Sequence, residues 1–183
     1  MIVKYLAKFI LWIIGWKVVS KAAPVEKKYV VLIAPHTSNL DFFMGKLANW
    51  VMGVKPKVLV KKEIFNFFTS PLLRMWGGVP IDRSKGANVI VQVVKMVNEN
   101  DEFILGITPE GTRKRNPNWK TGFYRIADAA KVPICLAFID FGKKELSMEN
   151  MYFPTGDMEK DMLEIKLFYK DKVGYHPEKF AIE

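Results

Sequence analysis

The sequence predicts an α/β fold in which a largely parallel sheet is flanked by helices. Three observations support this prediction. Short apolar runs rich in β-branched residues alternate with stretches of helical periodicity, which is typical of parallel strands joined by helices. The 183 residues are enough for one core and too few for two ordinary domains. Half of the residues are apolar, so a core can form without a disulfide or a metal.

The first 23 residues are expected to form a helix at a membrane interface, preceding a single α/β domain over residues 24–183. Residues 9–16 carry no charge and include Trp12 and Trp16, and lysines flank them at positions 4, 8, 17 and 21. This run is shorter than the roughly 20 residues that span a bilayer. Tryptophans with terminal lysines are typical of a helix in the headgroup region. A core helix with lysines at its ends is the alternative, so the sequence leaves open whether this helix inserts or packs.

The elements of the predicted domain follow in order. Residues 30–34 are a continuous apolar run, which predicts a strand covered on both faces, and residues 40–52 have helical periodicity. The same criteria predict strands over 57–60, 103–106 and 134–139, and helices over 62–68, 87–98 and 122–131. A late strand is expected over 163–169, within forty C-terminal residues whose role the sequence does not indicate.

The net charge is +9, from 28 basic and 19 acidic residues. This excess indicates an anionic partner, such as a nucleic acid, a phosphorylated substrate, an acidic carrier protein or an anionic membrane. Nucleic acid is disfavoured because the aromatic residues lie mostly in apolar runs and no recognition motif occurs. Cys135 lies in an apolar run, which predicts a core residue in a reduced, intracellular protein. One cysteine and two distant histidines match no metal-ligand spacing.

His36 and Asp41 are the first candidate site residues. They lie where the strand over 30–34 ends and the next helix begins, which is where α/β sheets build their sites. Five residues within a helix would separate the two side chains by about 140°, so they can meet only if His36 lies on the turn. Ser38 or Asn39 can cap the helix. An Asp that accepts from one ring nitrogen leaves the other free as a base. Taken alone, the pair favours a histidine packed at a helix start.

Two further loops carry groups that can bind anions. Gly77 and Gly78 precede a segment that ends in Arg83, whose planar guanidinium suits a phosphate or carboxylate. Residues 108–113 follow the strand over 103–106 and combine a carboxylate, a glycine, a hydroxyl and an arginine, ahead of three more basic residues. Each motif alone is also compatible with an ordinary turn carrying a surface charge.

In this order, His-x4-Asp at 36–41, Ile-Asp-Arg at 81–83 and Pro-Glu-Gly-Thr-Arg at 109–113 resemble a known family. It is the glycerolipid acyltransferase family of lysophosphatidate (1-acylglycerol-3-phosphate) acyltransferases. Lys61-Lys62-Glu63 and Val132-Pro133-Ile134 add to the resemblance, which covers roughly residues 30 to 140. The chain is shorter than typical members, and Pro80 stands where many have a large apolar residue. We therefore expect a small divergent branch, with the identity of the acceptor left open.

The resemblance implies an acyltransferase of phospholipid biosynthesis in which His36, oriented by Asp41, takes the proton of an acceptor hydroxyl. The hydroxyl then attacks the thioester of acyl-CoA or acyl carrier protein directly. No Gly-x-Ser-x-Gly elbow occurs, in agreement with this mechanism. The thioester is already activated, so no metal or other cofactor is implied. The residues that the resemblance assigns to substrate binding are Arg83, Lys61 and Arg113 for the acceptor phosphate, and Glu110, Gly111 and Thr112 around the acceptor.

Membrane lipids and the acyl donor are the expected partners, and a peripheral or monotopic position on the cytoplasmic face of a membrane is the expected location. The alternatives are transfer to a lipid acceptor without glycerophosphate, a thioesterase, and a non-catalytic membrane lipid-binding protein. His176 is expected to be a surface residue. Acyl-chain length, the donor and the oligomeric state cannot be read from the sequence.

Overall fold

The computed structural model describes residues 2–20, 23–84 and 88–182, and its centre is a sheet of five strands. The strand order is β1-β7-β6-β2-β5. The pairs β1·β7, β6·β2 and β2·β5 are parallel and β6·β7 is antiparallel, which confirms the predicted largely parallel sheet. The bounds are β1 Lys17–Val18, β2 Lys28–Ala34, β5 Phe103–Ile107, β6 Ile134–Asp140 and β7 Glu145–Tyr152.

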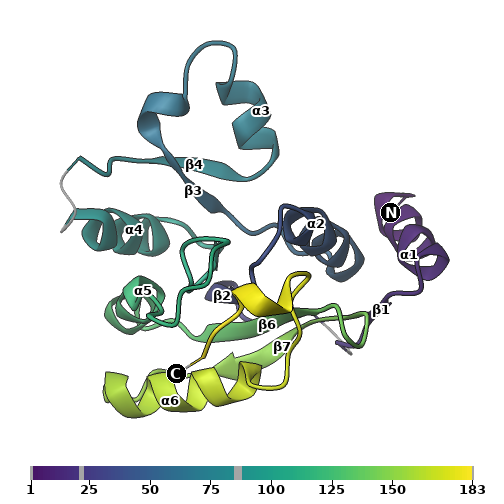
Figure 1. The fold of residues 1–183 in the computed structure, drawn as a ribbon. Helices are drawn as coiled ribbons and strands as arrows, with labels where there is room; N and C mark the ends of the chain where they lie inside the picture. The colour runs from purple at the N-terminus through teal and green to yellow at the C-terminus, as the bar shows by residue number, and fades with distance from the viewer. Residues whose placement is uncertain (1, 21–22, 85–87, 183) are drawn as a thin grey trace.

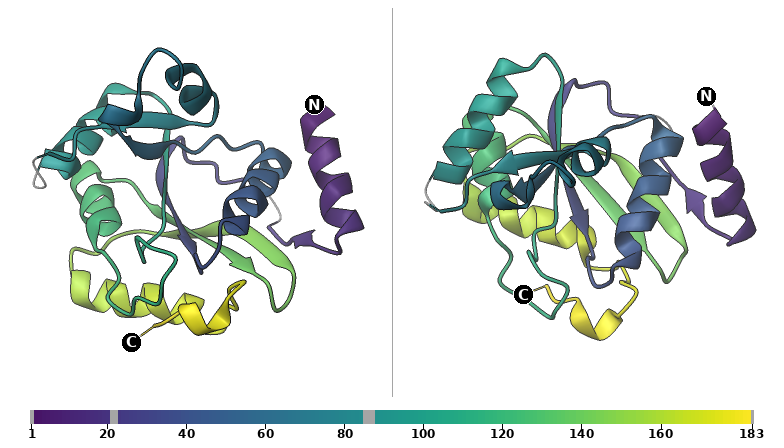
Figure 2. Two further views of the ribbon diagram at one scale, coloured as in Figure 1. Left: turned by 45° about the horizontal axis from the view of Figure 1, so that its top comes forward. Right: turned by 90° about the horizontal axis from the view of Figure 1, so that it is seen from above.

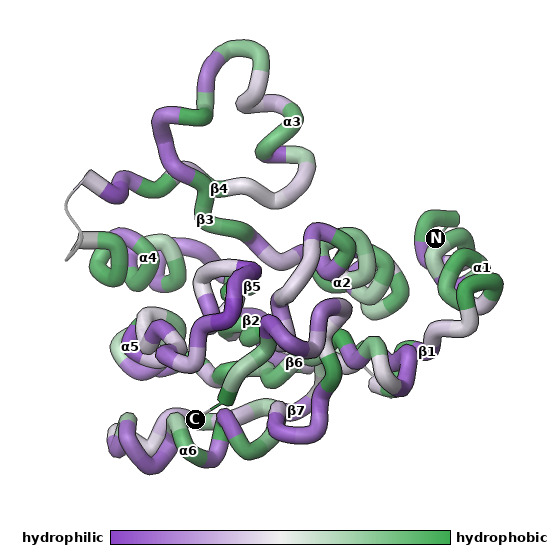
Figure 3. The backbone as a smooth tube through the Cα atoms, viewed as in Figure 1, coloured by the Kyte–Doolittle hydropathy of each residue, from purple (hydrophilic) through white to green (hydrophobic). Residues whose placement is uncertain are grey.

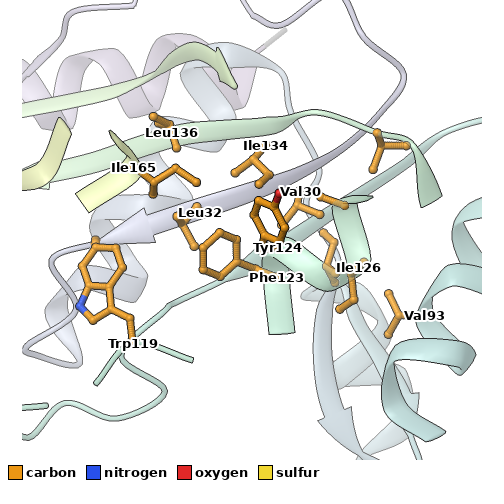
Figure 4. Packing of buried hydrophobic residues seen from close by; sticks show 14 of the residues in the cluster. Val30, Leu32, Val93, Trp119, Phe123, Tyr124, Ile126, Ile134, Leu136 and Ile165 are labelled. Atoms are coloured by element: carbon orange, nitrogen blue, oxygen red, sulfur yellow. The ribbon is translucent and has the colours of Figure 1, made fainter. Parts of the chain in front are cut away.

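Helices cover both faces of this sheet (Figure 1), and alternate residues of β2 point to opposite faces. Val30 and Leu32 pack with α4 Asn88–Glu99, α5 Gly122–Ala130 and α6 Met158–Tyr169. Figure 4 shows Phe123, Ile126 and Ile165 gathered around this face. The other face is covered by α2 Leu40–Met52, whose Met44 and Ala48 pack on Ile139. The strand predicted over 30–34 and the helix over 40–52 are therefore confirmed.

The N-terminal helix α1 Ile2–Ile13 packs one face on the core and leaves the other exposed. Ala7 and Leu11 are buried beside α2, and β1 then joins the edge of the sheet next to β7. Both views of Figure 2 place α1 on the far side of α2 from the rest of the chain. Of the predicted segment 1–23, residues 1, 21 and 22 lie outside the described residues. Within the described ranges, no helix has the length and hydropathy needed to cross a membrane.

A small lobe projects from the sheet between α2 and α4 (Figure 1). It consists of β3 Val58–Lys61, the 3-10 helix η1 Lys62–Ile64, α3 Ser70–Met75 and β4 Gly78–Ile81, with β3 and β4 paired in parallel. The helix predicted over 62–68 is wrong. The Asn66 side chain accepts N–H bonds from Phe68 and Thr69 and forms a turn, and α3 begins beyond it with Pro71 in its first turn.

Both glycines at the start of β4 are required by close backbone contacts. A Cβ on Gly77 would lie 2.5 Å from the Pro56 carbonyl oxygen, and Gly77 has a φ of 87°. A Cβ on Gly78 would lie 2.8 Å from the carbonyl oxygen of Leu73. The Gly-Gly pair thus lets β4 lie directly against the chain that enters the lobe.

The strand predicted over 163–169 is also wrong, since these residues form the second half of α6. Asp157 accepts the N–H of Lys160 at the start of that helix, and Asp161, Ile165 and Tyr169 are buried at four-residue spacing. The antiparallel partner of β6 is instead β7, which the sequence analysis did not predict. The helix predicted over 87–98 begins at residue 87, outside the described residues, and α4 occupies most of that range. The strands over 103–106 and 134–139 and the helix over 122–131 are confirmed, each to within one residue at one boundary.

Candidate active site

His36 and Asp41 meet where β2 ends and α2 begins. The His36 Nδ1 lies 3.1 Å from the Asp41 Oδ2. The same Oδ2 accepts the backbone N–H groups of Thr37 and Ser38 at 2.7 and 2.9 Å. A carboxylate oxygen that already accepts two amide protons is an acceptor for the ring as well, so Nδ1 is the donor and Nε2 is the free nitrogen. The predicted geometry, with His36 on the turn and Asp41 in the first turn of the helix, is what the structure has.

The helix begins after one of the two predicted caps, and Asp41 holds the turn that precedes it. Asn39 is the N-cap residue, and its side chain makes no capping hydrogen bond. The Ser38 hydroxyl accepts the N–H of Leu40 at 3.1 Å. Asp41 is 3% exposed, whereas the His36 side chain is 24% exposed. The acid is therefore buried beneath a histidine that remains open to solvent.

Glu110 lies on the loop after β5 and links this loop to the turn after β2. Its Oε1 accepts the backbone N–H of His36 at 2.9 Å, across 74 residues of sequence. Burial raises the pKa of Glu110 from its usual 4.5 to about 7, against the hydrogen bonds that favour the carboxylate. Asn116 and Lys120 hold the same loop, through the Glu110 and Pro109 carbonyl oxygens respectively. Glu110 thus fixes the backbone on which His36 stands.

The C-terminal segment after α6 supports the His36 turn from outside. The Thr37 hydroxyl is buried and accepts the N–H of His176 at 3.1 Å. Gly174 lies so close that a Cβ there would be 2.8 Å from Thr37 Oγ1. The His176 ring is 39% exposed and faces Glu178 at 3.6 Å, in keeping with its expected surface position. Sequence reasoning missed this contact, because residues 139 positions apart carry no local signal of their proximity.

A pocket of about 240 Å³ opens beside His36 and Asp41. Its lining is mostly apolar and includes Gly45 of α2, Gly106 of β5 and Val58 of β3. A second, almost wholly apolar cavity of about 400 Å³ shares Phe42 and Val58 with the first. It continues between α2 and the lobe, and its other lining residues are Val60, Leu72, Leu73, Trp76 and Gly78. Together the two form an apolar groove that starts at the His36 ring.

Lys46 is a groove residue that the sequence analysis did not predict. It lines the pocket with His36, and its Nζ donates to the Trp76 carbonyl oxygen at 2.9 Å. The ammonium also lies 5.7 Å from the centre of the Phe42 ring and 5.4 Å from that of Trp76. Burial lowers the pKa of Lys46 from its usual 10.5. No motif marks this lysine, whose position depends on how α2 packs against the lobe.

The predicted anion-binding residues lie outside the groove lining, at the end of β3, just after β4 and on the loop after β5. Arg83 follows β4, and its guanidinium donates to the Leu59 carbonyl oxygen at 3.2 Å. Lys61, at the end of β3, and Arg113 are exposed. Thr112 accepts the N–H of Lys114, and Gly111 has a φ of 63°, with Lys120 across it. Among the described residues, none of these five lines the pocket at His36.

Other expectations concern residues away from this site. Cys135 is fully buried in the core, as predicted. Within the described part of the chain, no three His, Cys, Asp or Glu side chains cluster as metal ligands would. A cavity of about 530 Å³ lies between α6 and the C-terminal segment, lined by Leu163, Lys166, Leu167, Lys170, Phe180 and Ile182. It contains none of the predicted site residues.

Comparisons with known proteins agree with this architecture. Residues 17–139 match the family model described as Acyltransferase. The 1-acyl-sn-glycerol-3-phosphate acyltransferase of Limnanthes douglasii is 26% identical over 132 residues, which are 68% of this chain and 46% of that protein. The chain thus spans about half the length of this curated relative.

A solved structure shares the fold. It is the crystal structure of the 1-acyl-sn-glycerophosphate (LPA) acyltransferase, PlsC, from Thermotoga maritima. The likeness has a TM-score of 0.61 at 16% identity and covers 92% of this chain and 77% of that one. The family model covers well over half of the sequence and includes all three motifs. The chain therefore belongs to the glycerolipid acyltransferase family that its ordered motifs resemble.

Proposed function

We propose that this protein transfers a fatty acyl group from a thioester donor, acyl-CoA or acyl carrier protein, to the hydroxyl of a lysophosphatidate-like glycerolipid. The observation that carries the proposal is the His36–Asp41 pair at the start of an apolar groove. The base and a site for a hydrocarbon chain lie side by side, as acyl transfer to a lipid requires. Family membership adds the reaction class.

In the proposed reaction, Asp41 holds Nδ1–H, and the free Nε2 of His36 accepts the proton of the acceptor hydroxyl. The hydroxyl oxygen attacks the thioester carbonyl carbon and forms the new C–O bond. When the tetrahedral intermediate collapses, the C–S bond breaks, and the thiolate sulfur takes the proton back from His36. Asp41 stabilises the imidazolium formed in between, and no acyl-enzyme is needed.

We assign the acyl chain to the groove between α2 and the lobe. Its second part is lined by apolar side chains from both elements, and burial of a chain there gains about 0.8 kcal/mol per methylene group. Gly45 supports this assignment. It lies within α2, a Cβ added there would meet nothing within 4 Å, and the open space is the pocket itself.

Arg83, with Lys61 and Arg113, is proposed to bind the acceptor phosphate. These side chains are exposed cations close to strand ends, and Arg83 offers a fork that suits phosphate. The proposal predicts that Arg83→Ala weakens transfer to a phosphorylated acceptor and spares an acceptor without phosphate. Equal loss with both acceptors would contradict this role.

The N-terminal helix is proposed to attach the enzyme peripherally to a membrane, on its cytoplasmic face. Ile2, Tyr5, Phe9, Trp12 and Ile13 of α1 are all more than half exposed, and Lys4 and Lys8 are exposed among them. An apolar face with neighbouring lysines suits an anionic lipid interface. The packed face, with Ala7 and Leu11, holds this helix against α2.

The decisive experiment assays acyl transfer from acyl-CoA to lysophosphatidate by wild type, His36→Ala and Asp41→Asn. We expect His36→Ala to lose at least a thousandfold in kcat and Asp41→Asn to lose on the order of a hundredfold or more. Circular dichroism checks that each variant is folded. Full activity of either variant would overturn the assigned roles.

The products separate the remaining functions. Free fatty acid from acyl-CoA, in place of an acylated lipid, would identify a thioesterase. A product from acceptors without a phosphate would identify a different acceptor class. Lipid binding without any thioester cleavage would identify a non-catalytic lipid-binding protein. A screen of a lipid extract with labelled acyl donor separates the first two outcomes, and sedimentation with liposomes tests the third.

A further inference from the structure

The tip of the lobe, residues 64–75, carries exposed apolar side chains that the proposed function has not used. Phe67 and Phe68 are 88% and 84% exposed, and Leu72 and Met75 are also largely exposed. Figure 3 shows hydrophobic residues along this tip, as on α1 and α2. A contiguous exposed set of this kind marks an interaction surface.

Side-chain hydrogen bonds hold the backbone of the tip in an ordered turn. The Asn66 side chain accepts the N–H groups of Phe68 and Thr69 at 2.9 and 3.0 Å. The Thr69 hydroxyl accepts the N–H of Asn66 and donates to the Ile64 carbonyl oxygen. Several polar groups at the tip are thus satisfied internally while the two rings point outward. Polar groups that reach the hydrocarbon region of a bilayer must be satisfied internally.

The charges around the tip suit an anionic surface. Residues 61–83 contain four basic residues, Lys61, Lys62, Arg74 and Arg83, against Glu63 and Asp82. Lys62 pairs with Asp82 at 3.2 Å, and Arg74 lies 5.8 Å from the centre of the Phe65 ring. Aromatic rings bordered by cations resemble, in chemistry, the exposed face of α1.

The position of the tip connects it to the groove. Leu72 is exposed at the tip and also lines the apolar cavity between α2 and the lobe. Figures 1 and 2 place α2 between the lobe and α1. A bilayer in contact with the lobe tip and α1 would therefore face the groove between them, and a lipid chain could enter without crossing water.

We infer that the lobe tip is a second membrane-docking element, in which Phe67 and Phe68 insert into the interface of an anionic lipid bilayer while the adjacent basic residues contact its headgroups. This inference rests on the proposed function insofar as the groove takes a lipid chain. Its occupant is a lipid surface, because the satisfied turn, the cations and the continuity with the groove all suit lipid.

A label at the tip tests the insertion directly. Phe67→Cys is labelled with the environment-sensitive fluorophore NBD, and the native Cys135 is fully buried. With vesicles of phosphatidylcholine and phosphatidylglycerol at 3:1, we expect a several-fold rise in emission and quenching by spin-labelled lipid. Glu159→Cys on α6 is the control and should show neither. A label at 67 that stays water-like, while one at Trp12→Cys responds, would overturn the inference.

A paired variant tests the consequence for activity. Phe67→Ser/Phe68→Ser should weaken vesicle binding about tenfold or more, since two rings lose their burial. Transfer to a vesicle-borne acceptor should fall, and transfer to a water-soluble short-chain acceptor should not. The matched control is Leu163→Ser/Leu167→Ser, two exposed leucines on α6, which should bind vesicles like wild type.

The outcomes remain separable from those of the proposed function. If wild type transfers no acyl group to any acceptor, the proposed function fails, and vesicle binding and the label still decide on docking. If the Phe67/Phe68 variant binds vesicles as wild type does, docking fails whatever the activity. Lipid-free self-association that this variant abolishes would assign the tip to a second copy and would also overturn the inference.

Discussion

Glu110→Gln isolates the energetic role of the buried acid beneath His36. Burial raises the pKa of Glu110 from 4.5 to about 7, and glutamine keeps an oxygen to accept the His36 N–H. In the unfolded chain the acid ionises as pH rises through 4.5, whereas in the folded chain it stays protonated until about 7. An acid whose folded pKa is raised therefore costs stability as pH rises through that window.

The size of this cost follows from the width of the window. Each pKa unit corresponds to 1.36 kcal/mol, so the wild type should lose about 3 kcal/mol from this group between pH 4.5 and 7. Glu110→Gln has no such group to titrate. Its free energy of unfolding, relative to wild type, should therefore rise by about 3 kcal/mol across that range and change little above pH 7.

Urea denaturation at several pH values from 4.5 to 8.5, followed by far-UV circular dichroism, measures this difference. A constant offset is expected from the buried amide nitrogen of glutamine, which takes the place of Glu110 Oε2, an atom that has no hydrogen-bond partner among the described residues. The test is how the difference in the free energy of unfolding between variant and wild type changes with pH, not the constant offset. Glu102→Gln, at an exposed position, should parallel wild type. If Glu110→Gln also parallels wild type, the argument from burial is refuted.

Three further predictions concern the groove, the core and the lobe. Gly45→Ala should stabilise α2 by about 1 kcal/mol in thermal or urea unfolding. Gly45→Leu should fill the pocket and lower kcat/KM for long-chain donors at least tenfold relative to short-chain donors. An unchanged dependence of kcat/KM on chain length would place the acyl chain elsewhere. Asp161→Asn should cost about 2–3 kcal/mol at neutral pH, because Asp161 accepts bonds from Tyr124, Tyr152 and Thr155. These bonds lower the pKa of Asp161, so its contribution is present at neutral pH and lost on acidification, and a variant difference that does not shrink in acid would contradict this. Gly77→Ala should destabilise the lobe by roughly 3 kcal/mol, seen as faster hydrogen exchange in β4, with Gly122→Ala, where a Cβ meets nothing within 4 Å, as control.

The sequence predicted the buried centre of the fold well, because strands covered on both faces are continuous apolar runs. The prediction was wrong where one pattern of apolar residues fits both a strand and a helix. Residues 163–168 alternate Leu, Glu, Ile, Lys, Leu and Phe, which imitates the period of a half-buried strand. In the structure they are helical, and Leu163 and Leu167 are exposed while Ile165 is buried. Tertiary packing of α6 on the sheet decides the conformation there.

The contacts of the candidate site also include some that the sequence predicts and some that it does not. The His36–Asp41 contact was predictable, because a strand end, a proline and a helix start fix it within six residues. The bond from His36 to Glu110 and the place of Lys46 in the groove were not, since both depend on the packing of distant segments. Local chemistry can be read from a sequence, whereas long-range contacts are decided only when the chain has folded.

The bond between Thr37 and His176 has a consequence for the order of events in synthesis. Thr37 lies in the turn next to His36, yet the residue that bonds to its hydroxyl comes 139 positions later. On the ribosome, the turn leaves the exit tunnel long before His176 does. A growing chain can therefore pair β2 with β5 and β6 before residue 176 is made, so the turn gains this contact only after its sheet can form.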